Sequence, residues 1–200
     1  MIGLGLGLGL SGRSNRLGVP DISSTRVTIR RFSGQASTQV VLTDNLSLIN
    51  DIRNTAYPVL LDRSGNVINR LDPADVTKNI DGSAADITNW QKQCMVRVGG
   101  FYVKYYYDAA TNEKIWHLSP YPVRGYKYVR RRFLNMYGGY VHNDGVKNYL
   151  VSISDRWTTQ ARSLINYHEY AQNLGATYRA ISTQDRELYR LYFWLLEGTF

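Results

Sequence analysis

The side chains that could perform acid, base, nucleophilic or metal chemistry are few and widely spaced. The chain of 200 residues contains sixteen acidic residues, one cysteine and three histidines, which are His117, His142 and His168. No histidine has a second histidine or a carboxylate at metal-ligand spacing. His168 and Glu169 lack the further histidine, four residues after the first, that an HExxH zinc site requires. We therefore expect no catalytic residue, no metal site and no cofactor.

Cys94 lies in the apolar run QCMVRVGGF, residues 93–101. A single cysteine excludes an internal disulfide and a zinc site of the CxxC type. Free cysteines in apolar surroundings behave as small hydrophobic residues. We expect a buried, unreactive thiol at this position rather than a nucleophile.

Paired carboxylates are the catalytic chemistry that the composition leaves open. Glycosidases use two of them, on either side of the scissile bond. The candidates are Asp144, Asp155 and Glu169, which lie in expected turn or helix positions. No spacing favours one pair, so a glycan-cleaving depolymerase is the enzymatic alternative to a protein that is not an enzyme.

The basic triplet Arg130, Arg131 and Arg132 lies close to Tyr126 and Tyr128. One interpretation is a contact surface in which the arginines bind phosphates and the tyrosines stack on bases. The other is a solvated strand edge or an ion-paired subunit contact. The net charge of +8 permits an acidic partner. However, the charge is spread along the chain, whereas nucleic-acid-binding domains have a denser basic footprint, so we do not expect nucleic acid as the partner.

The chain begins MIGLGLGLGLSGRSNRLG, in which glycine alternates with leucine. The positive charges follow the apolar residues, which excludes a secretory signal, and the run is too short for a membrane span. In an extended chain the leucines share one face, where they could fill pockets while the peptide adds a strand to another protein's sheet. The other interpretation is a frayed terminus. The residues of this predicted anchor are Leu4, Leu6, Leu8, Leu10, Arg13 and Arg16.

The elements expected to position these residues are strands first and helices last, an α+β arrangement. Strands are expected at 26–30 and 37–42, a short helix at 46–52, hairpins at 58–71 and 94–120 with an ordered loop between them, and short strands near 136–144 and 147–154. Gly99 and Gly100 predict a bulge or bend in the first strand of the second hairpin.

Two helices are expected near the end of the chain. The first extends from a cap at Thr158 or Thr159 to Gly175, with an apolar face of Ala161, Leu164, Ile165, His168, Ala171 and Leu174. The second begins at Ser182, where Asp185 completes a capping box, and buries Leu188, Leu191, Tyr192 and Leu195.

Several segments carry a family resemblance, in the order RLDPADVTKNIDGSAAD, MVRVGGFYVKYYYD, IWHLSPYPVRGYKYVRRRF, YGGY, TTQARSLINYHEYAQNLG and DRELYRLYFWLLEGTF. This order resembles tail-fibre and receptor-binding proteins of tailed bacteriophages and prophages. Over about residues 62–200 it is similar to the C-type-lectin-like fold of formylglycine-generating enzymes and of retroelement-diversified phage tropism proteins. The chain has VGGFY where the family has IPKFY, and it lacks the copper-binding cysteines, so the resemblance does not imply that enzymatic activity.

The resemblance implies a virion structural protein, a tail- or head-fibre or adaptor component that contributes to attachment to a host-surface glycan or protein. The expected organisation is an extended anchoring peptide at 1–20, a small β-rich adaptor region at 21–60 and a C-type-lectin-like domain at 61–200. Its partners would be tail, collar or capsid proteins at the N-terminus and further copies of itself, a trimer being usual for fibres. An internal nucleic-acid-binding virion protein remains a further alternative. Because the family continues past the second helix, we expect either a longer polypeptide or a protein that keeps only the scaffold half.

Overall fold

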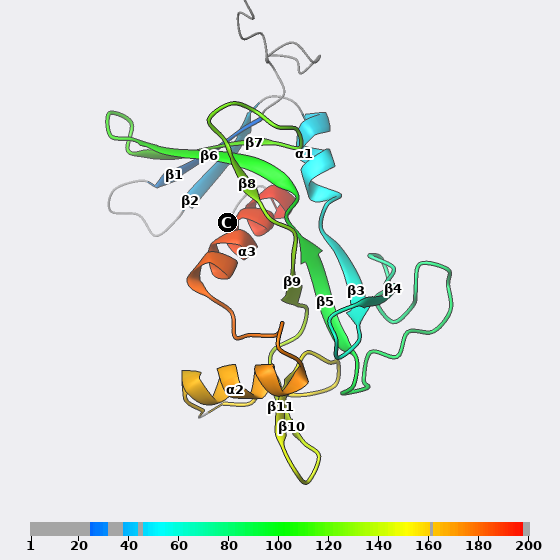
Figure 1. Ribbon diagram of the computed structural model, residues 1–200. Coiled ribbons are helices and arrows are strands. Elements are labelled where there is room, and N and C mark those ends of the chain that lie inside the picture. The colour runs from blue at the N-terminus through cyan, green and yellow to red at the C-terminus, as the bar shows by residue number, and fades with distance from the viewer. Residues whose placement is uncertain (1–24, 32–37, 44–45, 161, 198–200) are drawn as a thin grey trace, which may run out of the picture.

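The computed structural model describes residues 25–31, 38–43, 46–160 and 162–197, which form an α+β fold (Figure 1). The α+β class is confirmed, and the likeness to a C-type lectin stays a prediction. Three helices and three antiparallel sheets make up the described part of the chain. The helices are α1 (Leu46–Arg53), α2 (Leu164–Leu174) and α3 (Thr183–Glu197).

The largest sheet has the strand order β2-β1-β7-β6-β8. Its strands are β1 (Thr25–Arg31), β2 (Thr38–Thr43), β6 (Phe101–Asp108), β7 (Glu113–Ser119) and β8 (Lys127–Val129). The expected hairpin forms between β6 and β7, where Asp108 pairs with Glu113 next to the turn and Tyr102 pairs with Ser119 at the far end. β1 then extends the sheet on the other side of β7.

A second sheet has the order β4-β3-β5-β9 and lies below the first in Figure 1. Its strands are β3 (Tyr57–Leu61), β4 (Val67–Arg70), β5 (Gln93–Val98) and β9 (Arg132–Asn135). The predicted hairpin at 58–71 is confirmed, and its turn is closed by the Asp62 carboxylate, which accepts hydrogen bonds from the backbone N–H of Ser64 and of Asn66, each at 2.8 Å. β10 (Tyr140–Asn143) and β11 (Asn148–Val151) form a separate hairpin.

Two chain segments pass side by side from the first sheet to the second, a place that we call the crossing. One is the Gly99–Gly100 link between β5 and β6, and the other is the Arg130–Arg131 link between β8 and β9. Both glycines have positive φ, +87° and +89°, and Gly100 N–H donates to the Val129 carbonyl at 2.8 Å. The expected bend is confirmed, and it divides the predicted strand between two sheets.

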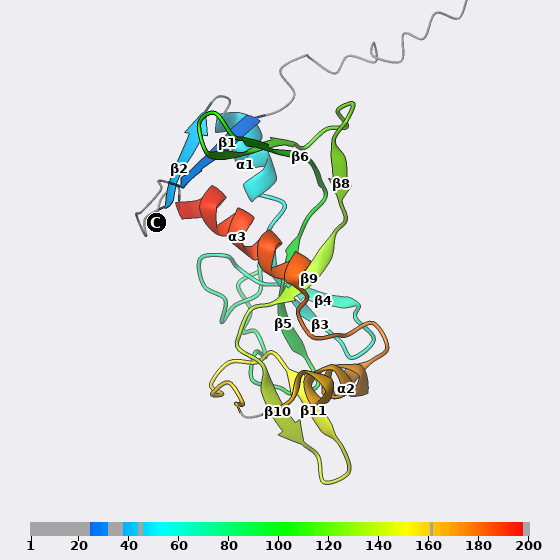
Figure 2. The same ribbon diagram turned by 90° about the vertical axis from the view of Figure 1, so that its left-hand side faces the viewer.

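The main core lies between the five-stranded sheet and the helices α1 and α3, which cover the same face of that sheet (Figure 2). Ile49 and Ile52 of α1 are completely buried there, together with Phe101 and Leu118. The predicted stripe of α3 is confirmed, because Leu188, Leu191, Tyr192 and Leu195 are all in this core.

The segment predicted as a separate β-rich region, 21–60, shares its sheet and its core with later segments. β1 pairs with β7 from Thr25 opposite Leu118 to Arg30 opposite Glu113. The expected boundary at residue 60 falls inside β3. The apolar face of α1 is buried against α3 and the β6–β7 hairpin. The structure therefore shows no domain boundary at residue 60.

α2 begins later than expected. Its N-cap is Ser163, whose hydroxyl accepts a hydrogen bond from Asn166 N–H at 3.1 Å, whereas Thr159 Oγ accepts from Val141 N–H in β10. The predicted apolar face is wrong in its first half, because Leu164 and Ile165 are 72% and 78% exposed. His168 is also exposed. Only Ala171 and Leu174, in the later turns, are buried in this helix.

Gly175 is the C-cap of α2, as expected, but it is extended rather than left-handed. A Cβ added there would come within 2.5 Å of the Arg63 carbonyl oxygen, so close approach of the backbone explains the glycine. The adjacent Tyr178 hydroxyl donates to the Asp62 carbonyl at 2.6 Å. These contacts fix the chain leaving α2 to the β3–β4 turn.

Candidate functional site

The outer face of the five-stranded sheet carries a row of aromatic and basic side chains. Along β6, Phe101 and Val103 face the core, so the alternate positions point away from α1 and α3. We call this surface the tyrosine face; its residues are Tyr102, Lys104, Tyr106, His117, Tyr126 and Tyr128. Register pairs Tyr102 with Tyr128 and Lys104 with His117, which puts the members of each pair side by side.

The rings of the tyrosine face contact one another in pairs. Tyr102 and Tyr128 lie with their centroids 5.1 Å apart. Tyr106 stacks on His117 at 5.5 Å, with its hydroxyl 3.3 Å from His117 Nε2, and Tyr126 meets the same imidazole edge-on. Tyr106 and Tyr128 remain 39% and 48% exposed. Flat rings held in place by neighbours, beside the exposed Lys104 ammonium, are suited to stacking against a flat ligand with polar edges.

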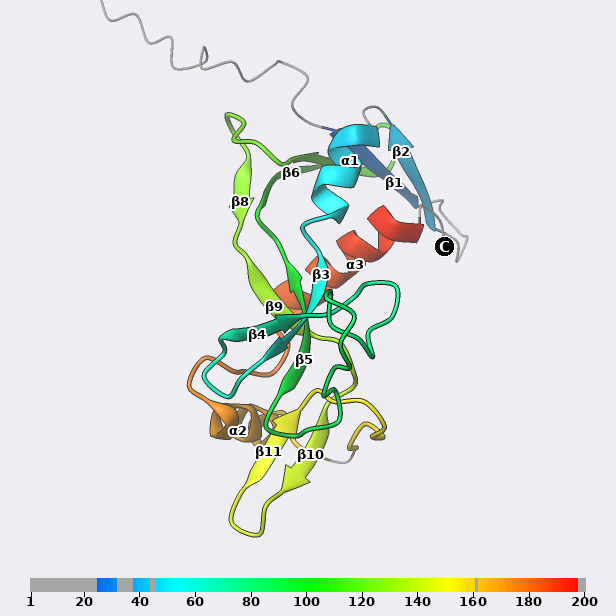
Figure 3. The same cartoon turned by 90° about the vertical axis from the view of Figure 1, so that its right-hand side faces the viewer.

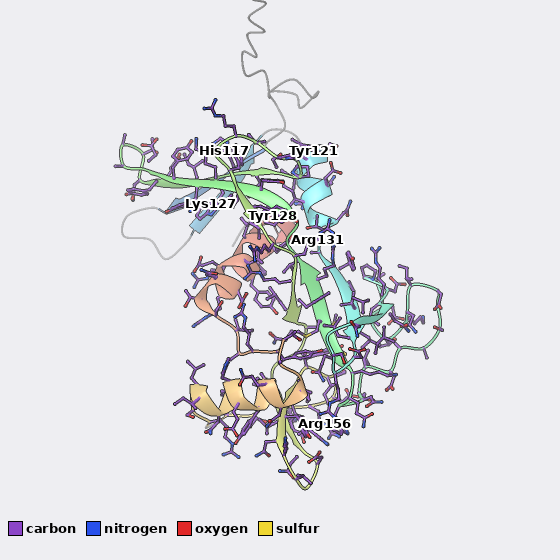
Figure 4. All side chains as sticks on the ribbon, in the orientation of Figure 1. His117, Tyr121, Lys127, Tyr128, Arg131 and Arg156 are labelled. Atoms are coloured by element: carbon purple, nitrogen blue, oxygen red, sulfur yellow. The ribbon has the colours of Figure 1, made fainter. Side chains whose placement is uncertain are left out.

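Figure 4 labels His117, Lys127 and Tyr128 around the five-stranded sheet, with Arg131 near the crossing. The structure therefore brings together the predicted Tyr126 and Tyr128 and adds rings from β6 and β7. Sequence analysis missed Tyr102 and Tyr106 as site residues. Their alternation with Phe101 and Val103 along one strand was the signal that could have found them.

The predicted basic triplet is divided by the crossing. Arg130 and Arg131 are exposed, and the Arg131 side chain lies over Gly100. Arg132 is half-buried in β9, where its guanidinium donates to the Asp185 carboxylate at 2.7 Å. The three arginines therefore do not form one patch, and Arg132 belongs to an ion pair within the chain.

Asp185, in the first turn of α3, is the centre of a charged cluster. The predicted capping box is present, because Asp185 accepts from Ser182 N–H at 2.9 Å and Ser182 Oγ at 2.7 Å, while its own N–H donates to Ser182 Oγ at 3.3 Å. Arg179 adds a second guanidinium at 2.8 Å. Burial raises the pKa of the Asp185 carboxyl, but the hydrogen bonds from Ser182, Arg132 and Arg179 outweigh it and hold that pKa well below its usual range.

A cavity of about 640 Å³ lies next to this cluster, between α2, the α2–α3 connection and the strands β5, β9 and β11. In Figure 3, α2 lies across β11, below β9 and the first turns of α3. Arg132, Arg179 and Asp185 line it together with apolar side chains and hydroxyl groups. Nothing in the sequence pattern indicated this cavity, because its walls come from segments up to 124 positions apart, Leu61 and Asp185 being the most distant.

Cys94 is completely buried in β5, and its thiol donates to the Ile87 carbonyl at 3.4 Å. Burial, with a smaller contribution from the charge of Asp86, raises its pKa to about 12. The expected burial of the Cys94 thiol is confirmed.

His142 stacks on Trp90, with their ring centroids 4.4 Å apart. Within the described ranges, no three His, Cys, Asp or Glu side chains gather in a group that could hold a metal ion.

The candidate carboxylates lie on separate elements. Asp144 closes the β10–β11 turn, where its carboxylate accepts from the N–H of Val146 and of Lys147 and from the Tyr149 hydroxyl. Backbone hydrogen bonds, that from Lys147 first, lower its pKa. Asp155 follows β11 with a positive φ of 58°, and Glu169 is exposed on α2. Asp144 is thus engaged in building its turn.

The predicted anchor residues, from Leu4 to Arg16, lie outside the described residues. No family model, curated protein or solved structure matches the chain. None of the described helices is long and apolar enough to span a membrane.

Proposed function

We propose that this chain is a non-enzymatic structural protein of a tailed-phage particle. It is a tail- or head-fibre or adaptor component, anchored to the virion through the peptide at residues 1–20, and it contributes to attachment by binding host-surface glycans through the tyrosine face. The order of motifs along the chain supports the virion assignment. The tyrosine face is the observation that carries the attachment function.

Sugar rings present flat apolar faces bordered by hydroxyl groups. An aromatic ring covers such a face, and a neighbouring polar tip or ammonium hydrogen-bonds the edge. Tyr106 and Tyr128 present exposed rings on one sheet face. Along β6, Lys104 lies between Tyr106 and Tyr102, and Tyr102 is the residue that pairs with Tyr128. Because strand pairing and ring contacts fix these side chains, little conformational entropy is lost on binding.

Binding of the full chain to host cells and to purified surface polysaccharide tests the attachment function. The double variant Tyr106→Ser, Tyr128→Ser should weaken binding by about 5- to 150-fold, since each of the two ring contacts contributes about 0.5–1.5 kcal/mol. Tyr107→Ser is the matched control, because Tyr107 is 51% exposed on the same strand but on the opposite face. Equal binding by all three proteins would contradict the role of the tyrosine face.

Analysis of these polysaccharide mixtures and a separate DNA titration discriminate between the proposed function and its alternatives. A depolymerase would release oligosaccharides from the polysaccharide, whereas an attachment protein leaves it intact. An internal nucleic-acid-binding protein would bind DNA with an affinity that falls steeply with salt concentration. Either result would replace the proposed function.

Anchoring is tested in particles of a phage whose genome encodes the chain. Deletion of residues 1–12 should leave a folded protein that is lost from purified particles. Replacement of the four leucines Leu4, Leu6, Leu8 and Leu10 by serine, with the length kept, should have the same effect. Particles that retain either variant at normal copy number would rule out the anchor.

A further inference from the structure

The cavity beside α2 has the size of a small-molecule binding site. Its volume of about 640 Å³ lies within the range of about 300–1,000 Å³ that is typical of such sites. The α2–α3 connection forms part of its wall and is held in place, because Tyr178 ties it to Asp62 and Arg179 ties it to Asp185 of α3. None of the interactions described above for the tyrosine face involves this cavity.

The charges on the cavity wall are unbalanced. Arg132 and Arg179 are its basic residues and Asp185 is its one acidic residue, so the described lining carries one net positive charge. Each guanidinium has five N–H donors. The bonds to Asp185 use one from Arg132 and two from Arg179. Arg179 gives one more to the Ala180 carbonyl at 3.4 Å. The remaining donors can bind an anionic group at this end of the cavity.

The rest of the wall is largely apolar. Phe133, Met95 and Leu150 line the interior. Leu164 and Ile181 also line the cavity yet are 72% and 37% exposed, so they form an apolar mouth between α2 and the α2–α3 connection. This arrangement explains why the first turn of α2 presents a leucine to solvent.

We propose that the cavity binds a small amphipathic acid, whose anionic head lies against Arg179 and Arg132 and whose apolar body lies between Phe133, Met95 and Leu150. The head can be a carboxylate, a sulfate or a phosphate, since a guanidinium binds all three. The proposal is independent of the attachment function and would stand if the tyrosine face bound nothing.

Calorimetric titration with octanoate and with octan-1-ol tests the proposal, because these probes share an apolar chain and differ in the charge of the head. The full chain should bind octanoate at least tenfold more tightly than octan-1-ol. Arg179→Gln should weaken octanoate binding about tenfold and leave octan-1-ol binding unchanged. Arg190→Gln is the control, because Arg190 is exposed on α3 and pairs with Glu187 outside the cavity.

Asp185→Asn should change octanoate affinity in the opposite direction to Arg179→Gln. The amide oxygen can still accept the capping-box hydrogen bond from Ser182 N–H, while the loss of the carboxylate charge raises the net positive charge of the cavity. Octanoate affinity should therefore rise several-fold, which no general damage to the cavity would produce. Absence of octanoate binding, equal affinity for the two probes, or weaker octanoate binding by a folded Asp185→Asn variant would overturn the proposal. If circular dichroism shows that Asp185→Asn is unfolded, the Arg179→Gln variant decides: octanoate binding as tight as that of the unmodified chain would overturn the proposal.

Discussion

Gly99 lies against the main chain of Arg130 so closely that a Cβ added to Gly99 would be 2.4 Å from the Arg130 carbonyl oxygen. These residues belong to the two links that pass between the sheets. Gly99 also has a φ of +87°, which side-chain-bearing residues rarely adopt. The glycine pair therefore allows two strands to leave one sheet and enter another at the same point.

Gly99→Ala should lower the free energy of unfolding by about 3 kcal/mol or more, because backbone strain and a backbone clash act together. Urea unfolding followed by circular dichroism measures the loss. Gly82→Ala is the matched control: Gly82 has a φ of +85° but no atom within 4 Å of an added Cβ. Strain alone should cost about 1–2 kcal/mol there. Equal losses in the two variants would show that the contact with Arg130 is not significant.

Tyr192 connects α3 to the crossing. Its hydroxyl accepts a hydrogen bond from Gly99 N–H at 3.0 Å and lies 2.5 Å from Thr55 Oγ. Tyr192→Phe should destabilise the protein by about 1–3 kcal/mol, because the buried Gly99 N–H loses its acceptor. Tyr107→Phe removes an exposed hydroxyl that donates to Asn112 and should cost less than about 0.5 kcal/mol. A Tyr192→Phe variant as stable as Tyr107→Phe in urea would exclude this role.

Sequence patterns predicted the elements whose signals are local. Ser182 and Asp185 are three residues apart and cap α3, and its leucine stripe is buried as expected. Asp62 and the Ser64–Asn66 turn likewise formed the expected hairpin. Local chemistry determines such features, since each depends on residues within a few positions of one another.

The features that sequence patterns missed depend on distant segments. The pairing of β1 with β7 joins positions about 90 residues apart, with Thr25 opposite Leu118. α2 has helical periodicity from Ala161 onward, but the two-stranded sheet covers only its later turns, so Leu164 is left at a cavity mouth. The ion pair of Arg132 with Asp185 across 53 positions removed one arginine from the predicted triplet. Periodicity predicts which face of a helix or strand is apolar, but it does not predict which other element packs against that face.

The Asp185 cluster makes stability depend on pH. Its carboxyl has a lower pKa in the folded chain than the ordinary value of about 4 in the unfolded chain. The unfolded chain therefore binds more protons, and the stabilisation is complete above about pH 5 and is lost as pH falls towards the folded-state pKa. Asp185→Asn should destabilise the protein more at about pH 7 than at about pH 3, as measured by urea unfolding.

Glu187→Gln is the control for this pH dependence. Glu187 lies on the same helix, but its side chain is 56% exposed and pairs with Arg190 at the surface. Exposed ion pairs contribute about 0–1 kcal/mol, so this variant should change stability little at either pH. If Asp185→Asn lowers the free energy of unfolding by the same amount at both pH values, the substitution acts through lost packing and not through the loss of the carboxylate charge.

Cys94 should be protected from thiol reagents while the protein is folded. Its side chain is completely buried, and its pKa of about 12 leaves almost no thiolate at about pH 8. A disulfide reagent such as Ellman's should therefore react slowly with the native chain and within minutes in concentrated urea. Val146→Cys provides a matched exposed thiol in the β10–β11 turn, where the native side chain is 85% exposed. Because β5 lies between β3 and β9 in its sheet, rapid stoichiometric reaction of native Cys94 would require those strands to separate readily, which contradicts the packing of this sheet.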